Sequence, residues 1–267
     1  MSGNQLAVVH DADGLTDERM AAFAAETNLS ETTFVQPPTR DGAAYRNRIW
    51  MPGRELPFAG HPSLGTAVAV ALARGDAAAT YVQETGAGLQ PVDVRVSARG
   101  GHASMLQAPV ELGDELDPAR VLAVAGLTPA DAAADLPCRL VSTGLPQLIA
   151  PVADASVLGR VRMDAPALAA LLAETGVTVL YLSAVSGETA RVRGFFAQGD
   201  MAREDPGTGS AAGPLMAYLH ARRGRERLAV TQGVEMGRRC LISCSVDGDR
   251  VRVGGDVTVV FRAEIDL

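Results

Sequence analysis

Cysteines, aromatic residues and basic residues are all scarce in this sequence. Only 3 cysteines occur in 267 residues, too few for a disulfide framework, and no charged segment followed by an apolar one opens the chain. We therefore expect a reduced, cytoplasmic protein. The 24 basic residues face 31 acidic ones, a net charge of -7, so no positive field is available for nucleic acid. Apolar runs such as 66–73 fall short of the roughly 20 residues of a bilayer span, so no membrane contact is expected.

Hydrophobic residues make up 47% of the chain, enough for one or two large cores. Both halves run in the same order: strands, a loop with Gly and Pro, one nearly apolar helix, then more strands. The helices are expected over 64–72 and 209–221. The pattern predicts an α+β fold of two pseudo-symmetric lobes, each a barrel-like sheet wrapped round a central helix. We place the lobes at 1–112 and 113–255, with a C-terminal strand within 256–267 as a candidate addition to the first.

Two clusters in the first half could carry chemistry. Glu31 stands between a helix end and a strand, among hydroxyl residues and the apolar neighbours Leu29 and Phe34, where a partly buried carboxyl can act as a general acid or base. The alternative is a solvated loop acid. His61 stands at the start of the first apolar helix, where backbone N–H groups bind anions and Gly60 leaves room for close approach. The alternative here is a structural histidine.

A third cluster, 204–214, places two acids before a run of small residues that opens the second apolar helix. It is again an anion cradle made of backbone donors. Gly207, Gly209 and Ala212 match a dinucleotide-binding spacing, but the expected strand order around them does not, so dinucleotide binding is the less favoured alternative. Cys240 and Cys244 lack the partners of a zinc site. The residues favour acid/base chemistry, without metal or cofactor, on a small anion held between two helix N-termini.

Four segments, 28–35, 55–62, 208–215 and 232–238, together resemble the PhzF family of phenazine-biosynthesis isomerases, whose fold is diaminopimelate-epimerase-like. The resemblance implies that Glu31 shuttles the proton, that His61 and Asp205 assist it, and that Ser210 seats the substrate carboxylate. The expected substrate-binding residues are Ser30, Gly60, Thr208, Gly209, Ser210 and Ala211. Racemases of the wider fold use two cysteines at positions corresponding to Ala59 and Pro206, so two-thiol racemisation is excluded.

The activity implied is that of a cofactor-independent isomerase of antibiotic biosynthesis, acting as a homodimer. It would move a proton or double bond in a small cyclic amino acid, such as trans-2,3-dihydro-3-hydroxyanthranilate or the dihydropyrrole diene of alkylproline pathways. The alternative is a non-catalytic protein that binds a small metabolite. Two departures from the family pattern stand out. The usual opening strand is missing, so either the start was assigned late or the first lobe has an open sheet edge that another element covers. Trp50 and Met51 replace the usual Phe-Thr, which bears on the pocket and its substrate.

Overall fold

A computed structural model describes residues 2–266, which divide into two compact units. The N-terminal unit comprises residues 4–105 and 254–266, and the C-terminal unit comprises residues 2–3 and 106–253. The division after residue 105 lies seven residues before the boundary that the sequence predicts. The reason is a strand where the sequence pattern indicated the end of the β region: β8 (Glu111–Leu116) pairs with β9 (Cys138–Ser142).

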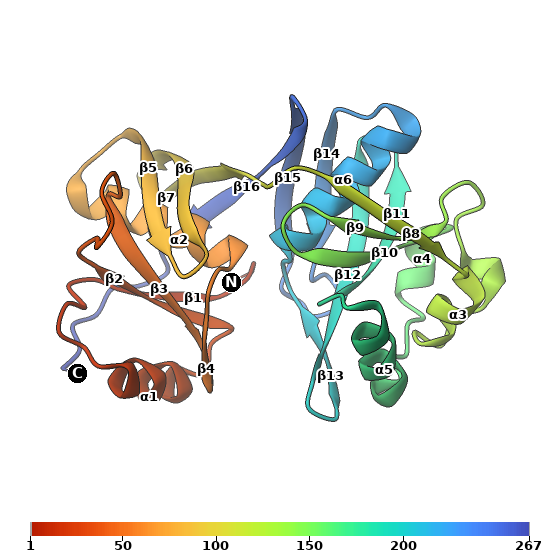
Figure 1. The fold of residues 1–267 in the computed structure, drawn as a ribbon, viewed down its shortest axis with the longest axis horizontal. Helices are drawn as coiled ribbons and strands as arrows, with labels where there is room; N and C mark the ends of the chain where they lie inside the picture. Colours follow the sequence, from red (N-terminus) through yellow and green to blue (C-terminus); the bar gives the residue numbers. More distant parts are fainter. Residues whose placement is uncertain (1, 267) are drawn as a thin grey trace. The chain divides into compact units, whose positions relative to one another are not determined.

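The N-terminal unit holds seven strands, part of an eighth, and two helices (Figure 1). Its sheet has the order β1-β2-β3-β5-β6-β7-β16, with β4 paired to β3. The strands are β1 (Leu6–Val9), β2 (Glu31–Gln36), β3 (Tyr45–Met51), β4 (Arg54–Leu56), β5 (Ala78–Thr85), β6 (Gly88–Ser97), β7 (Gly100–Leu106) and β16 (Arg250–Thr258). The helices are α1 (Asp17–Thr27) and α2 (Gly60–Arg74).

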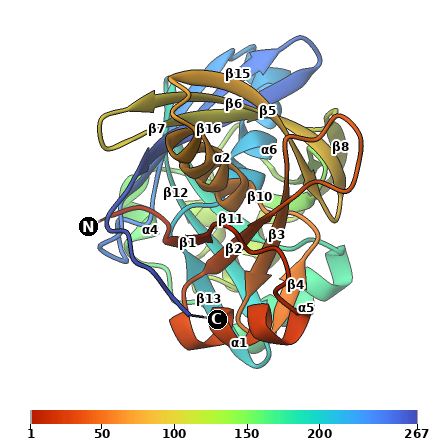
Figure 2. The same ribbon diagram turned by 90° about the vertical axis from the view of Figure 1, so that its left-hand side faces the viewer.

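Helix α2 forms the core of this unit. Figure 2 shows it lying against the curved sheet. Its Ala67, Val68 and Ala71 are fully buried among apolar residues of β3, β5, β6 and β7. Each buried Val of this kind stabilises the fold by about 1.5–3 kcal/mol. The helix ends at Gly75, whose φ of 77° makes it a left-handed C-cap. The apolar pattern of the sequence thus corresponds to a central helix.

The two faces of β2 contact different helices because side chains alternate along a strand. Thr33 faces α2, where its Oγ1 lies 2.7 Å from Oγ1 of Thr66. Phe34 faces the other way and packs with Trp50 in the cluster under α1. The sequence interpretation that Phe34 is an apolar neighbour of Glu31 is therefore wrong, because Phe34 and Trp50 share the opposite face of the sheet. That Trp50 bears on the pocket stays a prediction.

Strand β1 lies at the end of the sheet. Among the described residues it pairs with β2 alone, in parallel register, so no described strand covers its other edge. At the other end of the chain the predicted strand within 256–267 is shorter than expected. Strand β16 ends at Thr258, and residues 259–266 form no regular element. Residue 267 lies outside the described residues.

The C-terminal unit is larger and packs helices on both faces of its sheet (Figure 1). The sheet order is β16-β15-β14-β12-β11-β10-β9-β8, with β13 paired to β12. Its further strands are β10 (Pro146–Val152), β11 (Leu180–Ser186), β12 (Thr189–Gln198), β13 (Met201–Asp205), β14 (Arg227–Gln232) and β15 (Cys240–Asp247). Its helices are α3 (Pro118–Ala123), α4 (Ala155–Leu158), α5 (Ala165–Thr175) and α6 (Gly209–Arg223), with a 3-10 turn at Pro129–Asp131.

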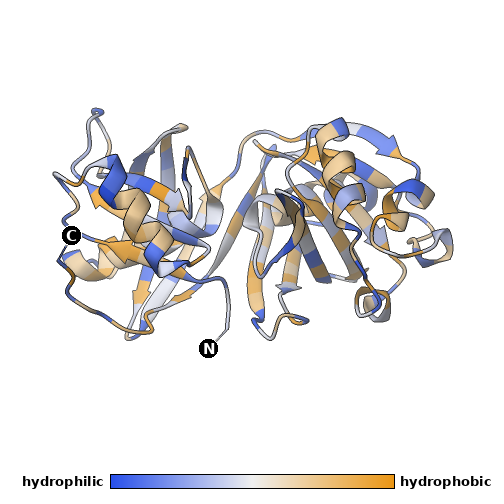
Figure 3. Ribbon diagram, turned by 90° about the horizontal axis from the view of Figure 1, so that it is seen from below, coloured by the Kyte–Doolittle hydropathy of each residue, from blue (hydrophilic) through white to orange (hydrophobic). Residues whose placement is uncertain are grey.

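Helix α6 is the counterpart of α2. Both helices are 15 residues long, begin at a glycine and end at a left-handed glycine, which for α6 is Gly224. Leu215, Met216 and Leu219 of α6 are fully buried, and hydrophobic residues recur along the helices and strands of both units (Figure 3). Among residues 2–266, no helix is both long and apolar enough to cross a membrane.

Gly213 lets a side chain pass close to α6. The Gln107 side chain donates from Nε2 to the Gly209 carbonyl at 3.0 Å, and its Oε1 accepts from the Thr143 hydroxyl at 2.6 Å. A Cβ at position 213 would stand 1.7 Å from that Oε1. The glycine therefore permits Gln107 to fix the first turn of the helix.

Gly213→Ala is expected to lower the free energy of unfolding by about 2 kcal/mol, because the displaced Gln107 loses both hydrogen bonds and this outweighs the better helix propensity of alanine. Urea denaturation measures the loss. Gly159→Ala is the control, since its Cβ would stand at an ordinary 3.5 Å from the Ser156 carbonyl, and it should change stability by less than about 0.5 kcal/mol. Equal effects of both changes would contradict the expected role of Gln107.

Candidate active site

The N-terminal unit brings Glu31 and His61 together. Glu31 is the first residue of β2 and His61 the second residue of α2, so the pairing of strand and helix sets their separation. Oε2 of Glu31 lies 3.3 Å from Nε2 of His61, and the two side chains are 18% and 23% exposed. Solvent therefore reaches both groups only in part. The pair can hold or exchange a proton with a small molecule.

Neighbouring polar groups determine where the proton sits on the neutral His61 ring. The amide nitrogen of Asn4 lies 3.3 Å from Nδ1, and since an amide NH₂ only donates, Nδ1 accepts. The ring proton is therefore on Nε2, which faces the Gln5 carbonyl at 3.2 Å as well as the Glu31 carboxylate. In this tautomer the Nε2–H of His61 donates to the Gln5 carbonyl, and the Glu31 carboxyl group lies beside it at ion-pair distance.

The first turn of α2 adds backbone donors beside this pair. Ala59 precedes the helix without a side-chain cap, and the Ser63 N–H and hydroxyl both donate to its carbonyl. Position 62 is proline and has no N–H, so Gly60 and His61 carry the N–H groups that a helix leaves open at this end. Ser30, half-buried, directly precedes Glu31. The predicted residues of the first half thus belong to one strand start and one helix start.

The predicted residues of the second half belong to the C-terminal unit. Asp205 is the last residue of β13 and lies opposite Gly194 of β12. Thr208 follows in the loop and donates its hydroxyl proton to Oδ2 of Asp205 at 2.5 Å. The side chain of Gln232, at the end of β14, contacts both residues: its Nε2 donates to the Asp205 carbonyl at 2.7 Å and to Oγ1 of Thr208 at 2.8 Å.

Helix α6 begins directly after this loop. The N–H groups of Ala211 and Ala212 both donate to the Thr208 carbonyl, at 3.1 and 3.0 Å. Within residues 2–266 the N–H groups of Gly209 and Ser210 have no acceptor from the chain, and both residues are half-buried. Gly209 and Ser210, with the serine hydroxyl, are therefore the donors that α6 can present to an anion, whereas the Ala211 N–H already serves the helix.

The strands around α6 differ from those of a dinucleotide site. Strand β13, before the helix, pairs antiparallel with β12, and β14, after the helix, pairs with β12 and β15. A dinucleotide-binding unit needs the two flanking strands to run parallel within one βαβ crossover that begins at the glycine loop. The glycine spacing at 207–212 therefore belongs to the start of a helix that lies in a different strand topology from that of a dinucleotide-binding unit.

Four residues that lie next to the predicted ones are not among the site residues predicted from the sequence. Asn4 sets the tautomer of His61, and Gln232, Tyr181 and Gly194 surround Asp205 and Thr208. Gln232 opens the fourth segment on which the family resemblance rests, so the sequence held a signal for it. Nothing in the local sequence marks Tyr181, which reads as an ordinary core residue of a buried strand.

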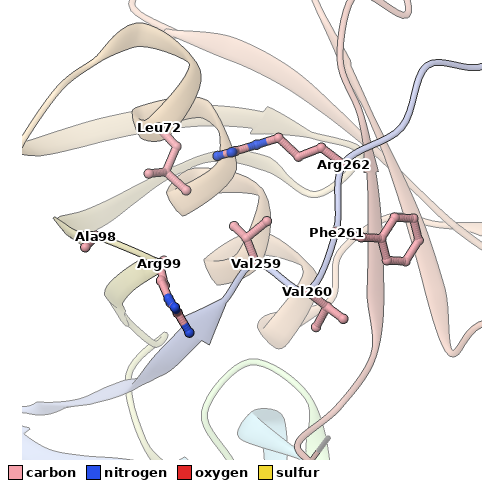
Figure 4. Close-up of a pocket in the computed structure, with 8 residues that line it drawn as sticks. Leu72, Ala98, Arg99, Val259, Val260, Phe261 and Arg262 are labelled. Carbon is pink, nitrogen blue, oxygen red and sulfur yellow. The ribbon is translucent and has the colours of Figure 1, made fainter.

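The N-terminal unit also has a cavity of about 440 Å³ apart from these residues (Figure 4). Leu72 and Val259 form part of its wall, and the guanidinium groups of Arg99 and Arg262 lie on different sides of it. Its remaining walls come from the turn before β7 and the segment after β16. None of the predicted site residues lines this cavity.

The cysteines are part of the core. Burial raises the pKa of the Cys138 and Cys244 thiols to about 12, so both stay protonated at neutral pH. Within the described residues, no group of three or more His, Cys, Asp or Glu side chains is placed to hold a metal ion.

Comparison with known proteins gives consistent matches over nearly the whole chain. A family model described as phenazine biosynthesis-like protein, PhzC-PhzF, matches residues 1–263. An isomerase of Mesorhizobium japonicum described as uncharacterized is 36% identical, over 97% of this chain and 92% of that protein. The trans-2,3-dihydro-3-hydroxyanthranilate isomerase of Pseudomonas aeruginosa is 34% identical, over 95% of this chain and 88% of that protein.

The fold of this chain also matches a solved structure over nearly its whole length. A solved structure from Pseudomonas aeruginosa, described as a predicted epimerase, is 34% identical and superposes with a TM-score of 0.86, over 99% of this chain and 94% of that chain. The expected α+β fold of the diaminopimelate-epimerase type is thereby confirmed.

Proposed function

Because the chain belongs to the PhzC-PhzF family of phenazine biosynthesis-like proteins, whose relatives are named isomerases, we propose that it isomerises a small cyclic amino acid through Glu31. The Glu31 carboxylate takes a proton from one ring carbon of the substrate. The carboxyl group, whose proton exchanges with solvent, then delivers a proton to another ring carbon, and the double bonds of the ring shift between the two. No other group needs to enter the reaction for its atoms and charges to balance.

The observation that carries this proposal is the 3.3 Å contact between Glu31 and the Nε2 side of His61. A general base needs a fixed direction and limited access to water. Half-burial supplies the second requirement. The His61 ring supplies the first, because Asn4 and the Gln5 carbonyl hold its two nitrogens and so fix the ring beside the carboxylate.

The substrate carboxylate is assigned to backbone donors at helix starts. In the C-terminal unit these are Gly209 and Ser210, whose N–H groups and hydroxyl complement an anion at the positive end of a helix dipole. Asp205, in the same unit, is assigned to the amino or hydroxyl group of the substrate. In the N-terminal unit, Ser30 and Gly60 are assigned to further polar groups of the substrate.

Two compounds are proposed as substrates: trans-2,3-dihydro-3-hydroxyanthranilate, on which the Pseudomonas aeruginosa relative acts by name, and a dihydropyrrole diene carboxylate. Each is incubated with the protein in D₂O and followed by proton NMR. An isomerase is expected to consume one of them and to place deuterium on a ring carbon of the product. A folded protein that binds a compound without exchanging any of its protons would overturn the proposal in favour of a non-catalytic binding protein.

A further inference from the structure

We propose that Gln232, supported by Tyr181, is a positioning residue that holds Asp205 and the start of α6 in place, and that Thr208 acts through Asp205. This inference rests on the function proposed above, in which Asp205 contacts the substrate. Its basis is a set of hydrogen bonds within the C-terminal unit.

The side-chain amide of Gln232 is saturated. Its Oε1 accepts from the Tyr181 hydroxyl at 2.9 Å and from the Thr208 N–H at 3.0 Å. Its Nε2 donates to the Asp205 carbonyl at 2.7 Å and to Oγ1 of Thr208 at 2.8 Å. An amide offers two acceptor and two donor positions, and all four are used. If the amide were flipped, its NH₂ group would face the Thr208 N–H and its oxygen would face the Asp205 carbonyl. Only the observed orientation of the amide therefore fits.

The hydroxyl of Thr208 has a fixed direction for the same reason. It accepts from Gln232 and therefore donates its single proton to Oδ2 of Asp205, at 2.5 Å. With that proton committed, the hydroxyl orients the carboxylate of Asp205. The two hydrogen bonds therefore point in the same direction, from Nε2 of Gln232 to Oγ1 of Thr208 and from Oγ1 to the Asp205 carboxylate. In such an arrangement each hydrogen bond strengthens the next.

The surroundings keep this arrangement buried and rigid. Tyr181 and Gln232 are fully buried, and burial holds the pKa of the Tyr181 hydroxyl well above its ordinary value, so it remains a donor. Gly194 leaves room for the side chains of Thr208 and Gln232, because a Cβ there would stand 3.0 Å from Oγ1 of Thr208 and 3.1 Å from Nε2 of Gln232. Every contact that fixes Asp205 here comes from a buried or half-buried group, which suits a residue that must meet a substrate without rearranging.

The first test does not depend on turnover. Gln232→Met removes the acceptor of the Thr208 amide, and hydrogen–deuterium exchange of that amide should accelerate at least roughly tenfold. Gln147→Met is the matched control: Gln147 is also a fully buried glutamine of this unit, and its Oε1 accepts from Thr178, outside the network. The control should leave the Thr208 amide within about twofold of the wild type. Equal exchange in both variants overturns the inference.

The second test uses turnover of whichever compound the wild type isomerises. Thr208→Val, close in shape but without the hydroxyl, should lower kcat at least roughly tenfold with KM within about twofold. Thr208→Ser keeps the hydroxyl and should restore most of kcat. A KM effect in place of a kcat effect would make Thr208 a substrate-binding residue and overturn its positioning role. If the wild type shows no turnover while the amide test succeeds, the isomerase proposal fails and the positioning of Asp205 stands.

Discussion

Glu31→Gln should reduce turnover by roughly 10³-fold while the protein stays folded and still binds its substrate. General acid/base groups contribute about 10²- to 10⁴-fold, and the amide of glutamine cannot take up a proton at neutral pH. Shape is conserved, and the glutamine side chain can keep the place beside Nε2 of His61, where Oε2 now lies 3.3 Å away. The measurement is deuterium incorporation into the ring of the substrate, with binding followed separately by calorimetry.

The matched control is Glu26→Gln, the same change at an exposed position of α1 in the same unit. It should leave turnover within about twofold of the wild type. Glu31→Asp retains a carboxyl group but withdraws it by one methylene, so its activity should lie between those of the wild type and the glutamine variant. Full activity of Glu31→Gln would show that another group moves the proton.

Gly233→Ala should destabilise the protein by about 3–5 kcal/mol, the largest stability effect that we expect. Gly233 has a φ of 73°, in the left-handed region, where a side chain costs about 1–2 kcal/mol. A Cβ there would also stand 2.5 Å from the Arg238 carbonyl oxygen and 2.7 Å from that of Pro206. Both are backbone atoms that cannot turn aside, so the loop before α6 would have to move.

Gly237→Ala separates the two contributions. Gly237 lies in the same segment with a φ of 67°, but its Cβ would meet nothing within 4 Å. It should therefore show only the conformational cost, about 1–2 kcal/mol. Thermal unfolding monitored by circular dichroism compares the two, and Gly233→Ala is expected to melt several degrees below Gly237→Ala. Equal melting temperatures would show that the approach of Pro206 to Gly233 does not matter for stability.

Local patterns in the sequence were sufficient to find the two central helices and the residues at their starts. Helix α2 is almost entirely apolar and begins with Gly60 and His61, and α6 repeats the arrangement from Gly209. A pattern of this kind depends on residues that are close along the chain, so it can be recognised without the fold. The same holds for Glu31 at the start of a strand.

The face of the sheet on which a side chain lies depends on the register of the strands. Nearness along the chain predicts Phe34 as an apolar neighbour of Glu31, yet alternation along β2 places it under α1 with Trp50. Sequence patterns do not predict strand β8, because five of its six residues are exposed and three are acidic, without the apolar alternation of a half-buried strand. It is a strand because it pairs with β9.

The sequence by itself determined the family, the two central helices and the choice of Glu31 as the proposed acid/base. Each of these depends on residues that are neighbours along the chain. The tertiary structure decided what orients those residues. Asn4 reaches His61 across 57 positions, and Gln232 reaches Thr208 across 24 and Tyr181 across 51. Such hydrogen bonds join strands and helices whose pairing no local pattern encodes, and they become visible only when the sheet brings the segments together.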